Sequence, residues 1–246
     1  MTHTPSSRPE PRGTSRGGVE RPLYSPLHVS QQPTTPPQPN FDRVARLYRW
    51  AEYLTLGPLL VRARNRFLPQ LPACKRALVL GDGDGRFVAN LLQHQPNLQA
   101  LAVDTSATML YLLRQRCIQN ISRLQTLQAS ALTIMPAHNT DLVVTHFFLD
   151  CLTQPEVDTL TQRLAAQLPA GALWLVSDFG QPHPRVLRPL AALYIRALYL
   201  AFRILTGLRV THLPNPQAAL QAAGFDRIAR HELLCGLIYT EIWQHR

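Results

Sequence analysis

Between Pro72 and residue 180 the sequence alternates short apolar runs with segments of helical periodicity, and this alternation constrains the fold more strongly than any other feature. Each run is apolar at consecutive positions, so both faces of the strand it forms must be covered. Strands of this kind, joined through helices, build a parallel sheet with helices on both sides. We therefore predict an α/β, doubly wound fold. The first five strands are expected at 77–80, 98–103, 124–127, 141–145 and 173–177.

Helical patterns occupy the connections between these runs and also flank them. An amphipathic helix is expected from Asn40 to about Leu54, and a second short one over 59–67. A long helix is expected over 185–206, within an inserted lid helix and connection of 185–215. The other expected helices lie around 87–92, over 106–120, after the capping box formed by Thr153 and Glu156, and over 215–224.

The last two apolar runs, Phe225–Leu233 and Leu237–Trp243, are separated by only a few residues around Cys235-Gly236. A parallel crossover needs a dozen residues or more, so these runs must pair antiparallel. The sequence therefore predicts a C-terminal antiparallel hairpin at the edge of a seven-stranded, mostly parallel sheet.

Residues 1–40 differ in composition from the rest of the chain, because they hold nine of its 21 prolines and almost no large aliphatic side chains. Such a segment cannot bury enough apolar surface to offset its ordering entropy, and we expect a disordered tail. It has neither the apolar run of a secretory signal nor the acid-poor composition of a transit peptide, which predicts a cytoplasmic protein. The remaining residues, 41–246, are expected to form one domain.

The formal net charge of the chain is +10, and residues 41–76 carry eight Lys or Arg but only two Asp or Glu. A basic surface attracts nucleic acid or an anionic membrane, so both partners stay open, although no transmembrane segment is expected. The four cysteines have no Cys/His ligand spacing, so neither a metal site nor a disulfide framework is predicted.

The turn after the first strand carries the sequence Gly81-Asp-Gly-Asp-Gly85. Glycines at such a turn let a ligand approach the backbone and the amides of the next helix. A dinucleotide-binding loop has its third glycine one residue later, and Asp82 and Asp84 would repel phosphates. Asp104 ends the second strand, 23 residues beyond Gly81, where its carboxylate can accept hydrogen bonds from ribose hydroxyls. The pattern favours an adenosine without phosphates.

These features together resemble the class I S-adenosylmethionine-dependent methyltransferases, most closely the branch of ubiquinone- and menaquinone-biosynthesis enzymes. The likeness covers about 41–246 and implies a Rossmann-like methyltransferase fold. The segments that carry it are Phe41–Tyr48, Gly81–Gly85, Val103-Asp104 with Met109, Asp141–Val144, Ser177–Pro182 and Ala223–Phe225.

The resemblance implies S-adenosyl-L-methionine as the cofactor. The glycines would contact its methionine part, Asp104 its ribose and Met109 its adenine. The full set of implied cofactor-binding residues is Tyr48, Gly81, Asp82, Gly83, Gly85, Asp104, Thr105, Met109, Ser130, Ala131 and Thr145. Val79 and Ser130 stand where the family often has acidic residues, and Asp82 is expected to compensate for the first of these losses.

His146 and Asp150 follow the fourth strand and are the candidate catalytic pair, with the imidazole as proton acceptor and the carboxylate orienting it. The alternative is a strand-end histidine and a helix-capping aspartate. We predict methyl transfer to oxygen or carbon of a small apolar or aromatic molecule, since the helix over 185–206 has a wide apolar arc. An RNA or protein methyltransferase, and a non-catalytic binding protein that retains the fold, remain the alternatives. The sequence does not indicate an oligomeric state.

Overall fold

The computed structural model describes residues 56–184, 186, 189, 193 and 213–246. Several expectations from the sequence fall outside these residues. They are the tail over 1–40, the helix after Asn40 with Tyr48, and nearly all of the helix over 185–206 with its connection. Those expectations stay predictions.

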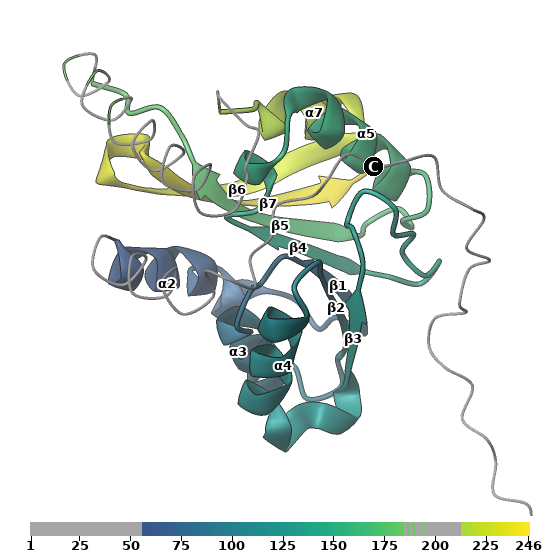
Figure 1. The fold of residues 1–246 in the computed structure, drawn as a ribbon. Coiled ribbons are helices and arrows are strands. Elements are labelled where there is room, and N and C mark those ends of the chain that lie inside the picture. The colour runs from purple at the N-terminus through teal and green to yellow at the C-terminus, as the bar shows by residue number, and fades with distance from the viewer. Residues whose placement is uncertain (1–55, 185, 187–188, 190–192, 194–212) are drawn as a thin grey trace, which may run out of the picture. The chain divides into compact units, whose positions relative to one another are not determined.

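The described strands form one seven-stranded sheet in the order β3-β2-β1-β4-β5-β7-β6 (Figure 1). Strands β1 to β5 pair parallel, whereas β7 pairs antiparallel with both β5 and β6. The predicted C-terminal hairpin at the sheet edge is therefore confirmed. The strands are β1 Arg76–Leu80, β2 Gln99–Asp104, β3 Leu124–Gln128, β4 Leu142–His146, β5 Leu173–Phe179, β6 Phe225–Leu233 and β7 Ile238–His245.

The helices cover both faces of this sheet, as the doubly wound prediction requires. Helices α2, α3 and α4 lie on one face, and α5 and α7 lie together on the other (Figure 1). The α-helices are α2 Gly57–Asn65, α3 Arg86–His94, α4 Ala107–Arg116, α5 Gln154–Ala165 and α7 Pro216–Ala222. Short 3-10 turns are η1 Leu68–Gln70, η2 Ile118–Arg123, η3 Leu149–Cys151 and η5 Leu234–Gly236.

The core lies between the sheet and these helices. Strands β1, β4 and β5 are buried along nearly their whole length, because each has a strand on both sides and helices above and below. Trp174 on β5 and Trp243 on β7, with Phe87 on α3, are among the largest fully buried side chains. Burial of this apolar surface fixes the register of the strands, and with it the edge at which their carboxyl ends meet.

The helix expected over 106–120 ends earlier, at Arg116, and continues as the 3-10 turn η2. Arg123 at the end of η2 accounts for the difference, because its guanidinium donates hydrogen bonds to the carbonyls of Leu92, Gln95 and Leu98 at the end of α3. Turning back toward α3 satisfies these carbonyls, which a continuing α4 would leave without this partner.

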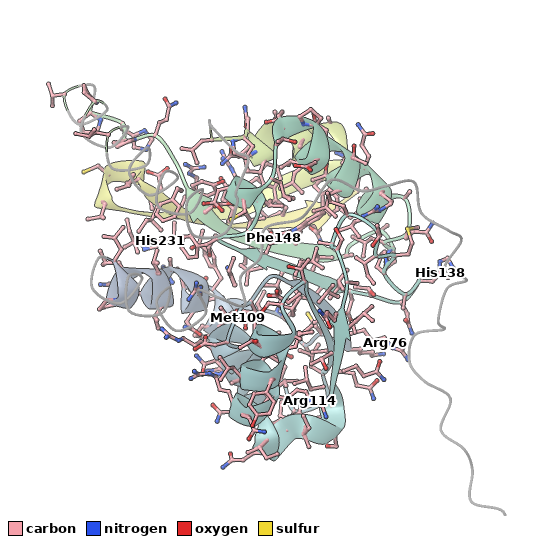
Figure 2. All side chains as sticks on the ribbon, in the orientation of Figure 1. Arg76, Met109, Arg114, His138, Phe148 and His231 are labelled. Atoms are coloured by element: carbon pink, nitrogen blue, oxygen red, sulfur yellow. The ribbon has the colours of Figure 1, made fainter. Side chains whose placement is uncertain are left out.

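Two opposite edges of the sheet can be distinguished by side chains that Figure 2 labels. Met109 and Phe148 follow the carboxyl ends of β2 and β4 and lie toward one side of the sheet. Arg76 and His138 lie at or before the starts of β1 and β4, toward the other side (Figure 2). In open α/β sheets ligands bind at the carboxyl edge, so this is where a site is expected. None of the helices among the described residues is long and apolar enough to cross a membrane.

Candidate active site

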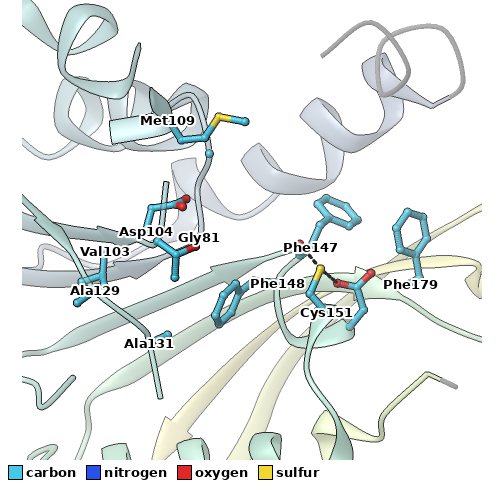
Figure 3. A pocket seen from close by; sticks show the side chains of 13 residues that line it. Gly81, Val103, Asp104, Met109, Ala129, Ala131, Phe147, Phe148, Cys151 and Phe179 are labelled. Atoms are coloured by element: carbon cyan, nitrogen blue, oxygen red, sulfur yellow. Dashed lines mark hydrogen bonds between the residues drawn. The ribbon is translucent and has the colours of Figure 1, made fainter. Parts of the chain in front are cut away.

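A pocket opens at the carboxyl edge of the sheet, between the turns that follow β1, β2, β3 and β4 and the last residue of β5 (Figure 3). Its empty space is about 820 Å³, a volume that includes open solvent at the mouth. The lining residues are Gly81, Gly83, Val103, Asp104, Thr105, Met109, Ala129, Ala131, Phe147, Phe148, Asp150, Cys151 and Phe179.

The loop after β1 reaches the pocket through backbone conformations that favour glycine. Gly81 has φ of +68° and Gly83 has φ of +61°. A Cβ on Gly81 would also lie 2.3 Å from the ring of Phe148, so the loop and the turn after β4 can approach only at a glycine. Gly85 does not line the pocket. A Cβ there would lie 2.6 Å from Leu113, which shows that this glycine serves the close packing of α3 on α4.

Asp82 points away from the pocket and caps helix α3. Its Oδ2 accepts a hydrogen bond from the backbone amide of Val88 at 3.0 Å, and its Oδ1 is buried without a hydrogen-bond partner among the described residues. Burial is the main cause that raises the pKa of Asp82 to about 7, while Arg64 and the Val88 amide act in the opposite direction. Asp82 is therefore part of the glycine loop after β1 but not of the pocket wall.

The wall beside the glycine loop is formed by the end of β2 and the segment after β3. Asp104 lines the pocket, and its Oδ1 accepts a hydrogen bond from the amide of Ser106 at 2.9 Å, which fixes the carboxylate at the start of α4. Thr105 and Met109 line the pocket beside it, as expected. Of the pair after β3, Ala131 lines the pocket and Ser130 does not, since the Ser130 hydroxyl accepts from the amide of Leu132.

Three phenylalanines form the opposite wall (Figure 3). Phe147 and Phe179 lie 5.3 Å apart between ring centroids, and the guanidinium of Arg64 lies 5.2 Å from the Phe147 centroid. Phe147 has φ of +52°, which is strained for an aromatic residue and is held by these contacts. Phe148 packs toward Gly81, as described above. The wall is aromatic and apolar, and it suits a flat ring.

The structure does not bring Thr145 or His146 to the pocket. Thr145 Oγ1 accepts a hydrogen bond from the indole of Trp174 at 3.0 Å. His146 is 2% exposed, and its ring lies edge-on to Phe87 with centroids 4.4 Å apart. Burial first, and Arg64 second, lower the pKa of His146 well below its ordinary value, so the imidazole is neutral.

A chain of hydroxyl groups fixes which ring nitrogen of His146 carries the proton. Thr240 donates to the carbonyl of Ala63 on α2, so Ser177 must donate to Thr240, and Nδ1 of His146 must donate to Ser177. The remaining nitrogen, Nε2, is buried and has no hydrogen-bond partner among the described residues. The network ties α2 to the sheet through Thr240 on β7, and His146 lies at its other end.

Asp150, the second candidate catalytic residue, does line the pocket, on the turn η3 after β4. It is 5% exposed, and burial is the first cause that raises its pKa to about 6. Its neighbour is not His146 but Asp178 on β5, whose carboxyl forms a side-chain hydrogen bond with it. The structure therefore separates the expected catalytic pair and supplies Asp150 with a different partner.

Sequence reasoning missed the aromatic wall, Cys151 and Asp178. Phe147, Phe148 and Phe179 directly follow or end strands β4 and β5, so the rule that ligands meet the carboxyl ends of parallel strands could have indicated them. The contact of Asp178 with Asp150 depends on the path of η3, for which the sequence carries no signal. Among the described residues there is no cluster of His, Cys, Asp and Glu that could hold a metal ion.

Comparison with known proteins shows a similarity for the segment that holds most of the pocket-lining residues. The sequence model of the methyltransferase-domain family matches residues 77–171. No curated protein matches the chain.

Solved structures resemble the chain over most of its length. An O-methyltransferase family protein from Burkholderia thailandensis is 18% identical with a TM-score of 0.61, over 82% of this chain and 59% of that one. An O-methyltransferase family 2 protein from Planctomyces limnophilus, in complex with apigenin, is 19% identical with a TM-score of 0.62, over 82% and 62%. The N-methyltransferase NodS from Bradyrhizobium japonicum, in complex with S-adenosyl-L-homocysteine, is 14% identical with a TM-score of 0.53, over 76% and 84%.

These comparisons show that the chain has the Rossmann-like methyltransferase fold. The branch of ubiquinone- and menaquinone-biosynthesis enzymes expected from the sequence is not supported, since the similar structures named above are O- and N-methyltransferases. The chain spans about 60% of the length of the two O-methyltransferase family proteins.

Proposed function

We propose that this protein is an S-adenosylmethionine-dependent methyltransferase that transfers a methyl group to a small molecule. The observation that carries the proposal is the pocket itself. It joins the positive-φ turns of Gly81 and Gly83 to the Asp104 carboxylate at the end of β2. The match of residues 77–171 to the methyltransferase-domain family supports the same conclusion.

The residues of the pocket fit this cofactor. Asp104 supplies an acceptor for ribose hydroxyls, and Val103, Met109, Ala129 and Ala131 supply an apolar slot for adenine. The bare backbone of Gly81 and Gly83 suits the amino-acid part, and no phosphate-binding cation lies among the lining residues. Thr105 borders the slot beside Asp104. We further propose that Tyr48, by its place in the resemblance, covers the bound cofactor.

Gly85, Asp82, Ser130 and Thr145 have indirect roles in this proposal, because their described contacts are with the protein. Gly85 lets α3 pack on α4, and Asp82 caps α3. Ser130 holds the turn after β3, and Thr145 accepts from Trp174. Each shapes the pocket wall without touching the ligand.

The methyl acceptor we propose is a small apolar or aromatic molecule attacked at oxygen or carbon. Phe147, Phe148 and Phe179 form an aromatic wall opposite the adenosine side of the pocket. The similarity to an O-methyltransferase family 2 structure that holds apigenin favours oxygen. We propose that the helix over 185–206 adds an apolar lid to this end of the site.

The cofactor supplies a methyl group that is already activated. The protein therefore has mainly to place the acceptor in line with it and to exclude water, and such positioning contributes ~7–11 kcal/mol in favourable cases. The rigid turns at Gly81 and Phe147 hold the two sides of the pocket at fixed separation. A proton acceptor is needed only where the attacking atom arrives protonated.

Two experiments test the proposal. Titration calorimetry of the full chain with S-adenosyl-L-homocysteine should show one site per chain. Incubation with methyl-labelled cofactor and a small-molecule extract should then place the label in low-mass products. Label in RNA or protein would favour the alternative substrate classes, and binding without transfer would favour a non-catalytic protein. A cytoplasmic location stays a prediction from the sequence, as does peripheral membrane contact through the basic segment 41–76.

A further inference from the structure

Two carboxyl groups meet at the acceptor end of the pocket, where β4 and β5 end. Asp150 lines the pocket from η3, and Asp178 lies behind it in β5, 1% exposed. The backbone amide of Asp150 donates to Oδ2 of Asp178 at 3.2 Å, and a side-chain hydrogen bond joins the two carboxyls. The amide of Phe179 donates to the other oxygen of Asp178 at 3.1 Å.

This contact requires a proton, because a carboxylate has only acceptor atoms. One carboxyl must be protonated, and burial together with the neighbouring like charge makes ionisation of both unfavourable. Burial raises the pKa of Asp150 to about 6 and that of Asp178 well above its ordinary value. The hydrogen bond between the side chains lowers the pKa of Asp150 and raises that of Asp178, so when the pair holds a single proton Asp178 is the donor and Asp150 is the carboxylate on the pocket side.

Other polar and titratable groups among the described residues surround the pair. Cys151 on η3 donates to Asp150 at 3.5 Å between sulfur and oxygen, and its thiol pKa is raised well above its ordinary value by burial and by the two carboxyls. Tyr239 and Glu241 on β7 face the same region, and Arg230 on β6 lies over the Tyr239 ring with 4.9 Å to its centroid. Arg230 also pairs with Glu241 and Glu232.

We infer that Asp150 is the proton acceptor for a hydroxyl-bearing methyl acceptor, and that Asp178 is a positioning residue that holds its carboxylate. This inference rests on the proposed function. As the oxygen attacks, its O–H bond breaks and the proton moves to Asp150. An O–CH3 bond forms while the S–CH3 bond of the sulfonium breaks, and the electron pair stays on sulfur. The acceptor lies among Phe147, Phe148 and Phe179, which favours a phenol.

The geometry assigns this role to Asp150 and not to His146. Asp150 lines the pocket, whereas His146 is buried outside it and uses Nδ1 to hold Ser177. A base that titrates somewhat below neutral pH is ionised at neutral pH and still accepts a proton in the transition state. Asp178 does not touch the pocket, so its part is to keep the Asp150 carboxylate in place by donating to it.

The first test measures the protons directly. The full chain, labelled with ¹³C at aspartate carboxyls, is titrated by NMR as wild type, Asp150→Asn and Asp178→Asn, with the exposed Asp226→Asn as matched control. Besides Asp82, whose signal should be present in all four proteins, we expect two carboxyls with raised pKa in the wild type, each absent from one variant. In Asp178→Asn the pKa of Asp150 should rise by roughly one unit, since an amide donates more weakly to a carboxylate than a carboxylic acid does. Ordinary titration of both carboxyls near pH 4 would contradict the inference that they share a proton.

The second test asks whether the pocket side of the pair recognises a hydroxyl. Binding of phenol, anisole and benzylamine to the chain loaded with S-adenosyl-L-homocysteine is measured by ligand-observed NMR. Phenol should bind at least ~10-fold more tightly than anisole, because one hydrogen bond to a charged group is lost in the ether. The preference should vanish in Asp150→Asn and below about pH 5, and persist in Asp226→Asn.

Each result decides something. Equal affinity for phenol and anisole, including no measurable binding of either, would overturn the inference, and tighter binding of benzylamine would make the pair a cation site instead. Asp178→Asn keeps an acceptor for one of the two amides that donate to Asp178, so unchanged Asp150 titration in that variant would limit Asp178 to a structural role. If the wild type fails to bind S-adenosyl-L-homocysteine, the proposed function fails, while the carboxyl titration still tests the pair by itself.

Discussion

Polar side chains around the pocket differ in whether they only make hydrogen bonds to the rest of the protein or also line the pocket. Asp82, Thr145 and His146 each hold another part of the chain, through the Val88 amide, the Trp174 indole and the Ser177 hydroxyl. Asp104 and Asp150 also make internal contacts, yet both line the pocket. Sequence spacing could indicate Asp104, because it ends a strand. It could not show that His146 turns inward, since the direction of a strand-end side chain depends on the pleat and on Phe87.

At the same scale, Asp104→Ala should weaken binding of S-adenosyl-L-homocysteine by about 10- to 100-fold, the loss of ~1.5–3 kcal/mol expected for hydrogen bonds to a charged group. Titration calorimetry measures it, with Asp226→Ala as the matched loss of an exposed carboxylate. Asp104→Asn retains an acceptor for the Ser106 amide, so this variant should leave helix α4 undisturbed. Unaltered affinity in a folded Asp104→Ala would refute the ribose assignment.

Asp82 gives a prediction about pH. Its pKa is raised to about 7 in the folded protein, so the unfolded state loses its proton first, and the contribution of Asp82 to stability falls as pH rises from about 4 through 7. Asp82→Asn keeps an acceptor for the Val88 amide and removes this dependence. Relative to wild type, the variant should gain ~2–3 kcal/mol between pH 5 and pH 8, at ~1.4 kcal/mol per pKa unit. Urea unfolding at both pH values checks it, and parallel curves for the two proteins would contradict it.

Individual elements follow the sequence where local signals are strong. The capping box at Thr153 is present as predicted, with Glu156 accepting from the Thr153 amide at 2.8 Å and Pro155 in the first turn. Helix α2 begins at Gly57 and Pro58, two residues before the start expected from the sequence, with Pro58 in its first turn. The early end of α4 could not be predicted, because it depends on Arg123 reaching carbonyls 25 to 31 residues earlier in the chain.

The capping box of α5 provides a prediction about a single helix. Thr153→Ala should destabilise the protein by ~0.5–2 kcal/mol, since it leaves a helix amide without its cap. Thr159→Ala is the control, because Thr159 lies exposed on the same helix and bonds only back to the Pro155 carbonyl. Urea unfolding of the three proteins measures the difference. Equal loss in both variants would show that helix propensity, and not capping, sets the stability of α5.

For the whole molecule, the parallel sheet and its C-terminal hairpin were predictable because apolar runs and connection lengths leave few arrangements. The hairpin of β6 and β7 follows from a connection too short for a crossover, and β7 joins β5 to complete the sheet. The pocket is a property of this scale, since its wall combines turns after four strands. Its aromatic side and the Asp150–Asp178 contact emerge only when those turns are packed together, and no local pattern encodes them.

A prediction at this scale concerns the segment before the domain. Removal of residues 1–40 should leave the thermal midpoint unchanged within a few degrees, because their composition supplies no core. Calorimetric melts of the full and shortened chains test this. A fall of more than about 4 °C, roughly ~1 kcal/mol or more for a domain of this size, would show that the segment contributes to the fold.

The place of β7 in the sheet has a consequence for synthesis on the ribosome. Strand β7 follows β6 in the chain but lies between β5 and β6, so β6 emerges before the only strand that it pairs with in the described sheet. A nascent chain halted before Ile238 therefore has an uncovered edge on β5 and an unpaired β6. Translation must pass β7 before the buried side of β5, with Asp178 and Trp174, is sealed from water. Until then the exposed strand edges leave the nascent chain open to pairing with other chains.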